Sequence, residues 1–365
     1  MSLRTDLAAA LGLRNVREPA PLPLPPTKTR RKQEHRPDDL RQFVGQDEPR
    51  LMILSAIKGA RARRKVPQHF LFSGPPGLGK TSLANLISSE TGGQLITVLG
   101  SQIANPAALV QLVARLSKKR VDTLFIDEVH GLKPAVMELL YLALEDLEFT
   151  VAQGRGDATS VETIEVPPFI CVAATTLPGE LTEPFRNRFK THVDLEYYVE
   201  DDLATIIFDY ISKDGGEIEP RAAEELASRS RGTPRIAQGL ATASWDHAIV
   251  MRGDQELHIT LNDVNEALSL KKIDQFGMGE KDRRVLRAHA NRKGRPMGPK
   301  SAAQSTGLTT QEVESTIEPY LIHKGFIRLT ERGRRITLLG FASLGLEPPT
   351  GFNDEAVMGE GWVDV

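Results

Sequence analysis

Residues 74–81 of the chain read GPPGLGKT and match the pattern G-x-x-x-x-G-K-[S/T]. An apolar run at 69–73 predicts a strand before this segment and the pattern at 81–90 predicts a helix after it, which is the setting in which such a loop binds phosphate. Its glycines let successive backbone N–H groups point at a phosphate, and the helix adds the positive end of its dipole. We therefore predict a nucleoside triphosphate site in which Lys80 reaches the β- and γ-phosphates and the Thr81 hydroxyl binds Mg²⁺.

The chain around this loop alternates between predicted strands and helices. Apolar segments at 121–126 and 169–174 predict two further strands, and helical patterns occupy 107–116 and 135–144. This alternation predicts an α/β unit with a parallel sheet and helices on both of its faces. Between 148 and 167, short β-like runs broken by glycines predict a hairpin inserted into the unit.

The strand predicted at 121–126 leads into two carboxylates, Asp127 and Glu128. The carboxyl ends of parallel strands share one edge of a sheet, so this pair is expected beside the phosphate loop. Asp127 is expected to complete the metal shell, and Glu128 to orient and deprotonate the attacking water. A second carboxylate favours hydrolysis over passive nucleotide binding.

Three further side chains fit the same reaction. Thr176 follows the strand predicted at 169–174 and can place a hydroxyl near the γ-phosphate or the attacking water. Arg186 and Arg188 come shortly afterwards, where an arginine suits a finger that reaches the nucleotide of a neighbouring subunit. The alternative for this arginine pair is a set of surface ion pairs.

The segment RGTPR at 231–235 predicts the start of another helix, with Thr233 as its cap and Pro234 at its first position. Arg235 could then fold a helical lid onto the phosphate. The alternative is a surface arginine beside a helix cap. From about 200 to 270 the spacing of Ala and Leu predicts helices throughout.

The composition narrows the class of protein. The 365 residues allow two or three domains, and 46 Lys and Arg against 48 Asp and Glu give a net charge of −2, so any nucleic-acid surface must be local. A single cysteine, Cys171, excludes an internal disulfide and fits a reducing compartment. No apolar run approaches the ~18 residues that a membrane span needs. These observations exclude disulfide-rich secreted and membrane-spanning classes and predict a cytoplasmic protein.

A local basic region lies between 279 and 340, where thirteen Lys and Arg occur with six Asp and Glu. The predicted elements are a helix at 301–305, an apolar helix through Leu321, and strands at 326–329 and 335–338 around a wing at 331–334. The two helices have helix-turn-helix spacing, and a basic wing suits the phosphate backbone of DNA. The alternative is a winged helix that binds protein.

Taken together, these motifs resemble the RuvB family of AAA+ ATPases, the motors of Holliday-junction branch migration. The likeness is carried by GPPGLGKT, TLFIDEVH, AATT, LTEPFRNRF, SRGTPRIA and EPYLIHKGFI, and extends from about residue 35 to 337. It implies an AAA+ P-loop NTPase fold with a large ATPase domain at 35–198, a helical lid at 199–278 and a winged-helix DNA-binding domain at 279–345. A flexible Pro-rich and basic extension at 1–34 and a disordered acidic tail at 346–365 would flank these domains.

The resemblance also implies roles for individual residues. For the pocket of ATP they are Arg36, Gly77, Gly79, Lys80, Thr81, Ser82, Tyr198 and Arg235, together with a stretch near the nucleotide formed by Glu145, Asp146 and Leu147. For catalysis they are Asp127 and Glu128 as the Walker B pair, Thr176 as sensor 1 and Arg188 as the arginine finger. For DNA it is Arg334 of the wing, and we expect its basic neighbours Arg328 and Arg332 to join it.

The partners implied by the family are a homo-hexameric ring, duplex or four-way junction DNA, and the junction-binding protein RuvA. Two positions depart from the family pattern. Leu329 stands where a second wing arginine is expected. In the inserted hairpin Glu162 stands at an apolar docking position for RuvA, whereas Ile164 keeps its character. Burying an unpaired carboxylate costs several kcal/mol, so the partner has co-adapted, the contact is shifted or missing, or the hairpin has no partner.

Two other functions remain open at this stage. One is a clamp-loader or initiator-like AAA+ switch, which uses ATP to load another protein onto DNA. The other is a protein-remodelling AAA+ ATPase, in which the winged helix binds protein.

Overall fold

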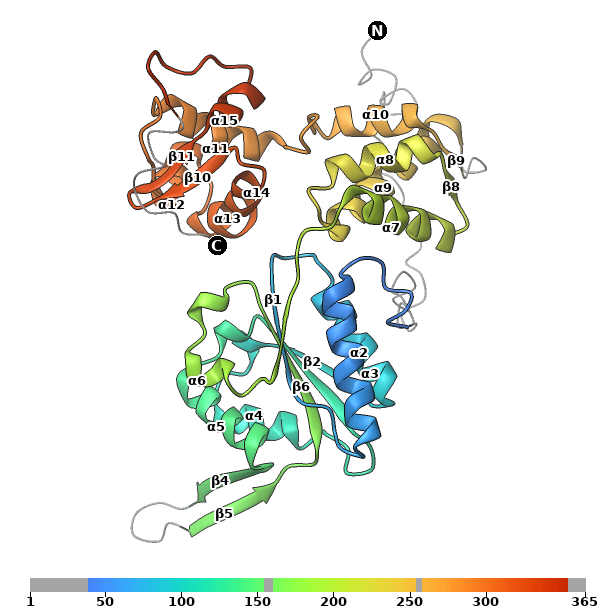
Figure 1. The fold of residues 1–365 in the computed structure, drawn as a ribbon, viewed down its shortest axis with the longest axis vertical. Coiled ribbons are helices and arrows are strands. Elements are labelled where there is room, and N and C mark those ends of the chain that lie inside the picture. Colours follow the sequence, from blue (N-terminus) through green and yellow to red (C-terminus); the bar gives the residue numbers. More distant parts are fainter. Residues whose placement is uncertain (1–38, 154–159, 254–257, 354–365) are drawn as a thin grey trace, which may run out of the picture. The chain divides into compact units, whose positions relative to one another are not determined.

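The computed structural model describes residues 39–153, 160–253 and 258–353 (Figure 1). These residues form two compact units, one of residues 39–209 with 233–235 and one of residues 210–232 with 236–353. The first unit contains a parallel sheet and a hairpin. The second contains most of a helical lid and a winged-helix domain.

A five-stranded parallel sheet is the centre of the first unit, with the order β2-β3-β6-β1-β7. The strands are β1 (Phe70–Ser73), β2 (Leu95–Leu99), β3 (Asp122–Asp127), β6 (Phe169–Thr175) and β7 (Thr191–Asp194). The three central strands are apolar along most of their length and almost wholly buried, as expected for a sheet covered on both faces. The three predicted strands are confirmed. The edge strands β2 and β7 were not predicted. The sequence THVD of β7 has one apolar residue, whereas the apolar and β-branched run LITVL of β2 was overlooked.

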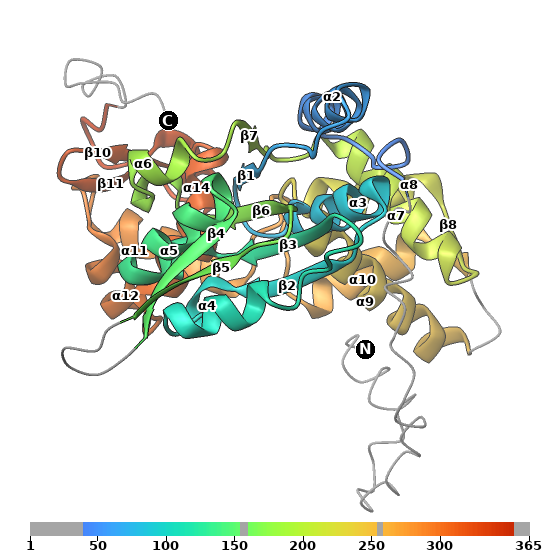
Figure 2. The same cartoon turned by 90° about the horizontal axis from the view of Figure 1, so that it is seen from below.

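Helices cover both faces of this sheet (Figures 1 and 2). They are α2 (Asp47–Ala62) and α3 (Lys80–Thr91) on one side, and α4 (Pro106–Val113) and α5 (Pro134–Glu145) on the other. Leu109, Leu112 and Leu140 of α4 and α5 pack with Leu124 and Cys171 of the sheet in one apolar core. The predicted α/β layer arrangement is therefore confirmed, and burial raises the pKa of the free Cys171 thiol.

The predicted hairpin is confirmed between α5 and β6. It consists of β4 (Glu148–Gln153) and β5 (Ser160–Glu165), which pair antiparallel. Glu162 pairs with Val151, and Ile164 pairs with Phe149. Residues 154–159, between the two strands, lie outside the described part of the chain.

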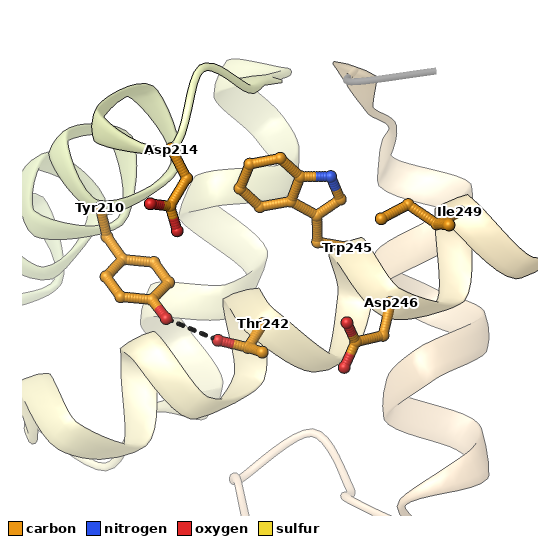
Figure 3. A pocket seen from close by; sticks show the side chains of 6 residues that line it. All are labelled: Tyr210, Asp214, Thr242, Trp245, Asp246 and Ile249. Carbon is orange, nitrogen blue, oxygen red and sulfur yellow. Dashed lines mark hydrogen bonds between the residues drawn. The ribbon is translucent and has the colours of Figure 1, made fainter. Parts of the chain in front are cut away.

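Four helices follow, as the Ala and Leu spacing predicts: α7 (Glu200–Lys213), α8 (Pro220–Arg229), α9 (Pro234–Arg252) and α10 (Leu261–Leu270). A short parallel pair, β8 (Glu217–Ile218) and β9 (His258–Ile259), was not predicted. A cavity of about 300 Å³ lies among these helices (Figure 3) and is lined by Tyr210, Asp214, Thr242, Trp245, Asp246 and Ile249. The hydroxyls of Tyr210 and Thr242 lie 2.8 Å apart in it.

The C-terminal region forms a winged helix around its own apolar core, which includes Leu286, Leu321 and Phe326. Its elements are α11 (Glu280–Asn291), α12 (Pro299–Thr306), α13 (Thr310–Glu312), a π-helical turn at Val313–Ile317, α14 (Glu318–His323), β10 (Ile327–Thr330), β11 (Gly333–Ile336) and α15 (Leu338–Ser343).

The second strand of the wing, β11, begins and ends two residues earlier than predicted. It covers 333–336 instead of 335–338, and Thr330 pairs with Gly333, so the tip is only the two residues 331 and 332. The Thr337 hydroxyl accepts a hydrogen bond from the Gly340 N–H and caps α15, which ends the strand. A helix start was therefore mistaken for the end of a strand.

The acidic tail also begins later than predicted. The ring of Phe352 lies 5.2 Å from that of Phe341, and the Arg335 guanidinium stacks on Phe352 at 4.8 Å. The packed winged helix thus extends to at least residue 352, beyond the expected boundary at 345. Residues 1–38 and 354–365 lie outside the described chain. Within the described ranges, no helix combines the length and apolar character that a membrane crossing requires.

Candidate functional site

The phosphate loop follows β1 and bends at three glycines. The φ angles of Gly74, Gly77 and Gly79 are +132°, +85° and +103°, values that favour glycine. A Cβ atom on Gly77 would lie 2.7 Å from Thr233 Cγ2 and 3.1 Å from Arg235 Cβ. Gly77 is therefore required by its own backbone and by the start of α9, which lies directly against the loop.

Lys80 is the first residue of α3, and its side chain folds back into the loop. Its Nζ donates hydrogen bonds to the carbonyls of Gly74 at 2.6 Å and Pro75 at 2.9 Å. Burial lowers the pKa of Lys80, while the charges of Glu128 and Asp127 act to raise it. The loop thus holds a buried cation beside two carboxylates, and a triphosphate would offer this ammonium group charged acceptors.

Asp127 ends β3, in the same sheet as the strand that precedes the loop. Burial raises its pKa, and the neighbouring Glu128 charge adds to the effect. A divalent cation would relieve this crowding of negative charge. Thr81, in the first turn of α3, supplies a hydroxyl of the kind that joins such a site. The residues present therefore fit a nucleotide with Mg²⁺.

Thr176 is joined to Glu128 directly. Its hydroxyl donates to Glu128 Oε2 at 3.0 Å, and its backbone N–H lies 3.4 Å from the same oxygen. The ends of β3 and β6 therefore bring together the two residues that were expected to handle the attacking water.

Tyr198 lies beneath the loop. Its side chain is buried and its hydroxyl donates to the Leu78 carbonyl at 3.3 Å. Burial raises the pKa of Tyr198, so the hydroxyl remains a donor. The neighbouring Phe43 ring leaves only 3.0 Å to a Cβ placed on Gly79. Both aromatic rings therefore fix the floor of the loop.

The other pocket residues differ in how the structure places them. Arg235 is exposed at the start of α9, and its charge acts to lower the pKa values of Lys80 and Asp127. Ser82 is half-buried in the first turn of α3. Arg36 lies outside the described residues.

Arg188 and the stretch 145–147 lie at the amino ends of the strands, opposite the carboxyl ends where the loop lies. The loop leaves β1 after Ser73, whereas the His69 ring, just before β1, donates to the Leu144 carbonyl at 3.2 Å. Arg188 Nε is 3.0 Å from Glu145 Oε1, an ion pair without hydrogen-bond geometry, and the guanidinium lies over the Tyr141 ring. These residues are brought to one another and not to the phosphate loop of their own chain.

The three wing arginines have different surroundings. Arg332 is exposed at the tip of the hairpin, and Arg328 is half-buried on β10. Arg334 Nε donates to Glu318 Oε2 at 2.7 Å, and that carboxylate is almost fully buried. Leu329, opposite Arg334 in the ladder, is 48% exposed, so the apolar substitution faces solvent. Only some of the basic side chains of the wing are therefore exposed to solvent.

Comparison with protein families matches nearly the whole chain. Residues 35–195 match the model described as the Holliday junction DNA helicase RuvB P-loop domain, 198–274 the RuvB AAA lid domain and 275–345 the RuvB C-terminal winged helix domain. The chain belongs to the RuvB family. Its resemblance to these proteins is confirmed, and so is the AAA+ P-loop ATPase fold with a lid and a winged helix.

Individual relatives agree with this assignment. The RuvB subunit of the Holliday junction branch migration complex from Lactobacillus gasseri is 40% identical over 314 residues, which cover 86% of this chain and 91% of the relative. The same subunit from Limosilactobacillus reuteri is 40% identical over 319 residues, with 87% and 93% covered. The structure of the Thermotoga maritima RuvB Holliday junction branch migration motor matches with a TM-score of 0.78 at 35% identity, covering 87% of this chain and all of that one.

Some residues at the site were not predicted. Phe43 supports the loop from a segment 31 residues upstream of it in the sequence, and Thr233 packs on Gly77 although its sequence context indicated only a helix cap. His130 was overlooked too, and its Nδ1 lies 3.3 Å from Glu128 Oε2. The one signal for His130 was its place two residues after the carboxylate pair.

Proposed function

We propose that this RuvB-family ATPase is an ATP-driven motor that moves DNA and drives branch migration of Holliday junctions in recombination and repair. The observation that carries the proposal is a divided site. The loop, the carboxylate pair and Thr176 lie at the carboxyl ends of the strands, while Arg188 lies at their opposite ends, where it would serve the nucleotide of a neighbouring subunit.

At the loop, Lys80 and the N–H groups of residues 77–82 would bind the triphosphate, with Arg235 and Tyr198 beside it. Mg²⁺, held by Thr81 and Asp127, would neutralise phosphate charge. Glu128 would accept a proton from the attacking water, and Thr176 would hold that carboxylate or the water in place. These assignments rest on the distances above and on the family.

Arg188, with Glu145, Asp146 and Leu147 next to it, would complete the nucleotide site of the adjacent subunit. An arginine that arrives from outside offsets charge in the transition state and makes hydrolysis depend on assembly. The proposal therefore includes a homo-oligomeric ring, a hexamer as the family implies. The domain limits of 35–198, 199–278 and 279–345 are part of the same proposal, with the last extended to take in Phe352.

The winged helix would contact the DNA backbone through Arg328, Arg332 and Arg334, and the bond of Arg334 to Glu318 would also hold the hairpin to α14. The hairpin of β4 and β5 would dock a RuvA-like junction-binding protein, with Glu162 requiring a compensating group on that partner. We place this work in the cytoplasm, where the reducing conditions suit a single buried thiol.

A four-way junction assay tests the function. The full chain with ATP and Mg²⁺, with and without RuvA of a relative, is expected to convert a four-way junction into two-stranded products. Junction-stimulated ATP hydrolysis without strand conversion would support a clamp-loader or initiator-like switch instead. Absence of DNA binding at low salt would support protein remodelling.

A further inference from the structure

The Glu128 carboxylate is held from one side. Its Oε2 accepts the Thr176 hydroxyl at 3.0 Å and lies 3.3 Å from His130 Nδ1. The backbone of Glu128 is left-handed, with φ of +48°, and its N–H donates to Asp127 Oδ1 at 3.1 Å. An unusual backbone and two polar neighbours therefore fix where this side chain points.

His130 lies in the short 3₁₀ turn Val129–Gly131, directly after β3. Its Nδ1 is 3.0 Å from the hydroxyl of Thr175, the last residue of β6, which is fully buried. That hydroxyl also accepts the Leu177 N–H at 3.0 Å. The imidazole thus lies between a rigid, buried hydroxyl and the carboxylate.

The chemistry of the neighbours indicates which tautomer is present. The hydrogen-bond partner of Nδ1 is the Thr175 hydroxyl, and Glu128 Oε2 lies close to the same nitrogen without hydrogen-bond geometry. An ionised carboxylate only accepts hydrogen bonds, so this close approach is electrostatically favourable when Nδ1 carries a proton. The Thr175 oxygen has two lone pairs and can accept from both Nδ1 and the Leu177 N–H. With a bare Nδ1, a lone pair would face the carboxylate. The surroundings therefore favour the Nδ1–H form.

We propose that His130 is a positioning residue, which holds Glu128 in the orientation that deprotonates the attacking water. When Thr176 turns its hydroxyl toward the nucleotide, His130 and Thr175 would be the groups that keep the carboxylate in place. The inference rests on the proposed function of Glu128, and it assigns His130 no contact with the nucleotide or the attacking water. His130 acts through Glu128 alone.

Three substitutions test the proposal: His130→Ala, His130→Asn and His130→Gln. The amide nitrogen of Asn lies one bond beyond Cγ, where Nδ1 lies, whereas the amide of Gln reaches the place of Nε2. We expect His130→Ala to lower the kcat of ATP hydrolysis about 10- to 100-fold, as loss of an orienting partner does. The KM, the nucleotide Kd and the Tm should stay close to those of the wild type. His130→Asn should recover most of the rate, and His130→Gln should not.

The controls separate this inference from the proposed function. His258 of the lid, which is half-buried and lies outside the nucleotide site, should leave the rate unchanged when it is changed to Ala. Glu128→Gln should bind nucleotide without turnover, and normal turnover there would overturn the function assigned to Glu128. If Glu128→Gln is inactive but His130→Ala hydrolyses ATP at or above the wild-type rate, the positioning role alone is wrong. It is also wrong if His130→Asn and His130→Gln give equal rates, or if His130→Ala lowers kcat, nucleotide affinity and Tm together.

Discussion

The nucleotide site and the winged helix use positive charge in opposite ways. At the loop the buried ammonium of Lys80 lies near two carboxylates and donates hydrogen bonds to two carbonyl oxygens. In the winged helix thirteen basic residues are available, but several are already bound within the fold. Arg283 pairs with Asp274, Lys281 with Glu312 and Arg334 with Glu318. The number of basic residues in the winged helix therefore overstates the positive charge that a ligand can contact. At the phosphate loop one lysine has a larger effect than its single charge suggests, because the loop holds it in a buried place.

Removing the loop charge should give the largest effect. Lys80→Ala is expected to weaken binding of a fluorescent ATP analogue about 100-fold or more, because the phosphates lose a desolvated cation. Lys58→Ala, an exposed lysine of α2, is the matched control and should bind as the wild type does. Equal nucleotide affinity in the two variants would show that the loop does not bind the triphosphate.

Arg188, at the strand ends opposite the loop, should affect the turnover of ATP and not its binding. Arg188→Ala is expected to keep nucleotide affinity and to lose about 10³-fold in kcat, the usual contribution of an arginine finger. Arg186→Ala, two residues away and exposed, should hydrolyse ATP normally.

Mixing variants separates action between subunits from action within one. Rings of Arg188→Ala and Lys80→Ala subunits should regain part of the activity that each lacks alone, since an intact loop then meets an intact finger. Hydrolysis by isolated monomers at the assembled rate would contradict the assignment.

In the winged helix single substitutions should have smaller effects on DNA binding, because the positive charge is distributed over many residues. Arg332→Ala should weaken duplex binding a few-fold and reduce the slope of log K against log salt by about one, the share of one phosphate contact. Arg284→Ala is the control, since that side chain donates to the Thr306 carbonyl at 3.0 Å. If Arg284→Ala weakens binding as much, the wing has no special part in DNA contact.

The sequence predicted most of the nucleotide site because its parts are local. A glycine loop between a strand and a helix, and acidic residues at a strand end, are read within a few positions of one another. Thr233 and Phe43 were missed because their contacts with the loop join distant segments. The bond of Arg334 to Glu318 was missed for the same reason, since it joins β11 to α14. The edge strand β7 was missed because partial exposure removes the apolar run that identifies a central strand, whereas β2 carries such a run in LITVL and was overlooked.

Two histidines sharpen the contrast between the two regions. His130 is half-buried with polar neighbours on two sides, whereas His289 in α11 is fully buried, and its ring nitrogens make no hydrogen bond of normal geometry within the described residues although the Arg334 backbone lies close. Burial lowers the pKa of His289 from 6.5 to about 4. Below pH 6.5 this histidine is protonated in the unfolded chain but stays neutral in the folded chain. The free energy of unfolding should therefore be highest above pH 6.5 and decrease as the pH falls toward 4.

At pH 4 and below, the decrease in the free energy of unfolding should reach about 3 kcal/mol, which corresponds to the lowering of the pKa of His289. Urea unfolding of the full chain, followed through the winged-helix transition between pH 7 and 4.5, measures it. His289→Leu fills the buried site without a titrating group and should lose less stability over this range than the wild type. Parallel curves for wild type and His289→Leu would mean that the buried ring takes its proton in the folded state as readily as in water.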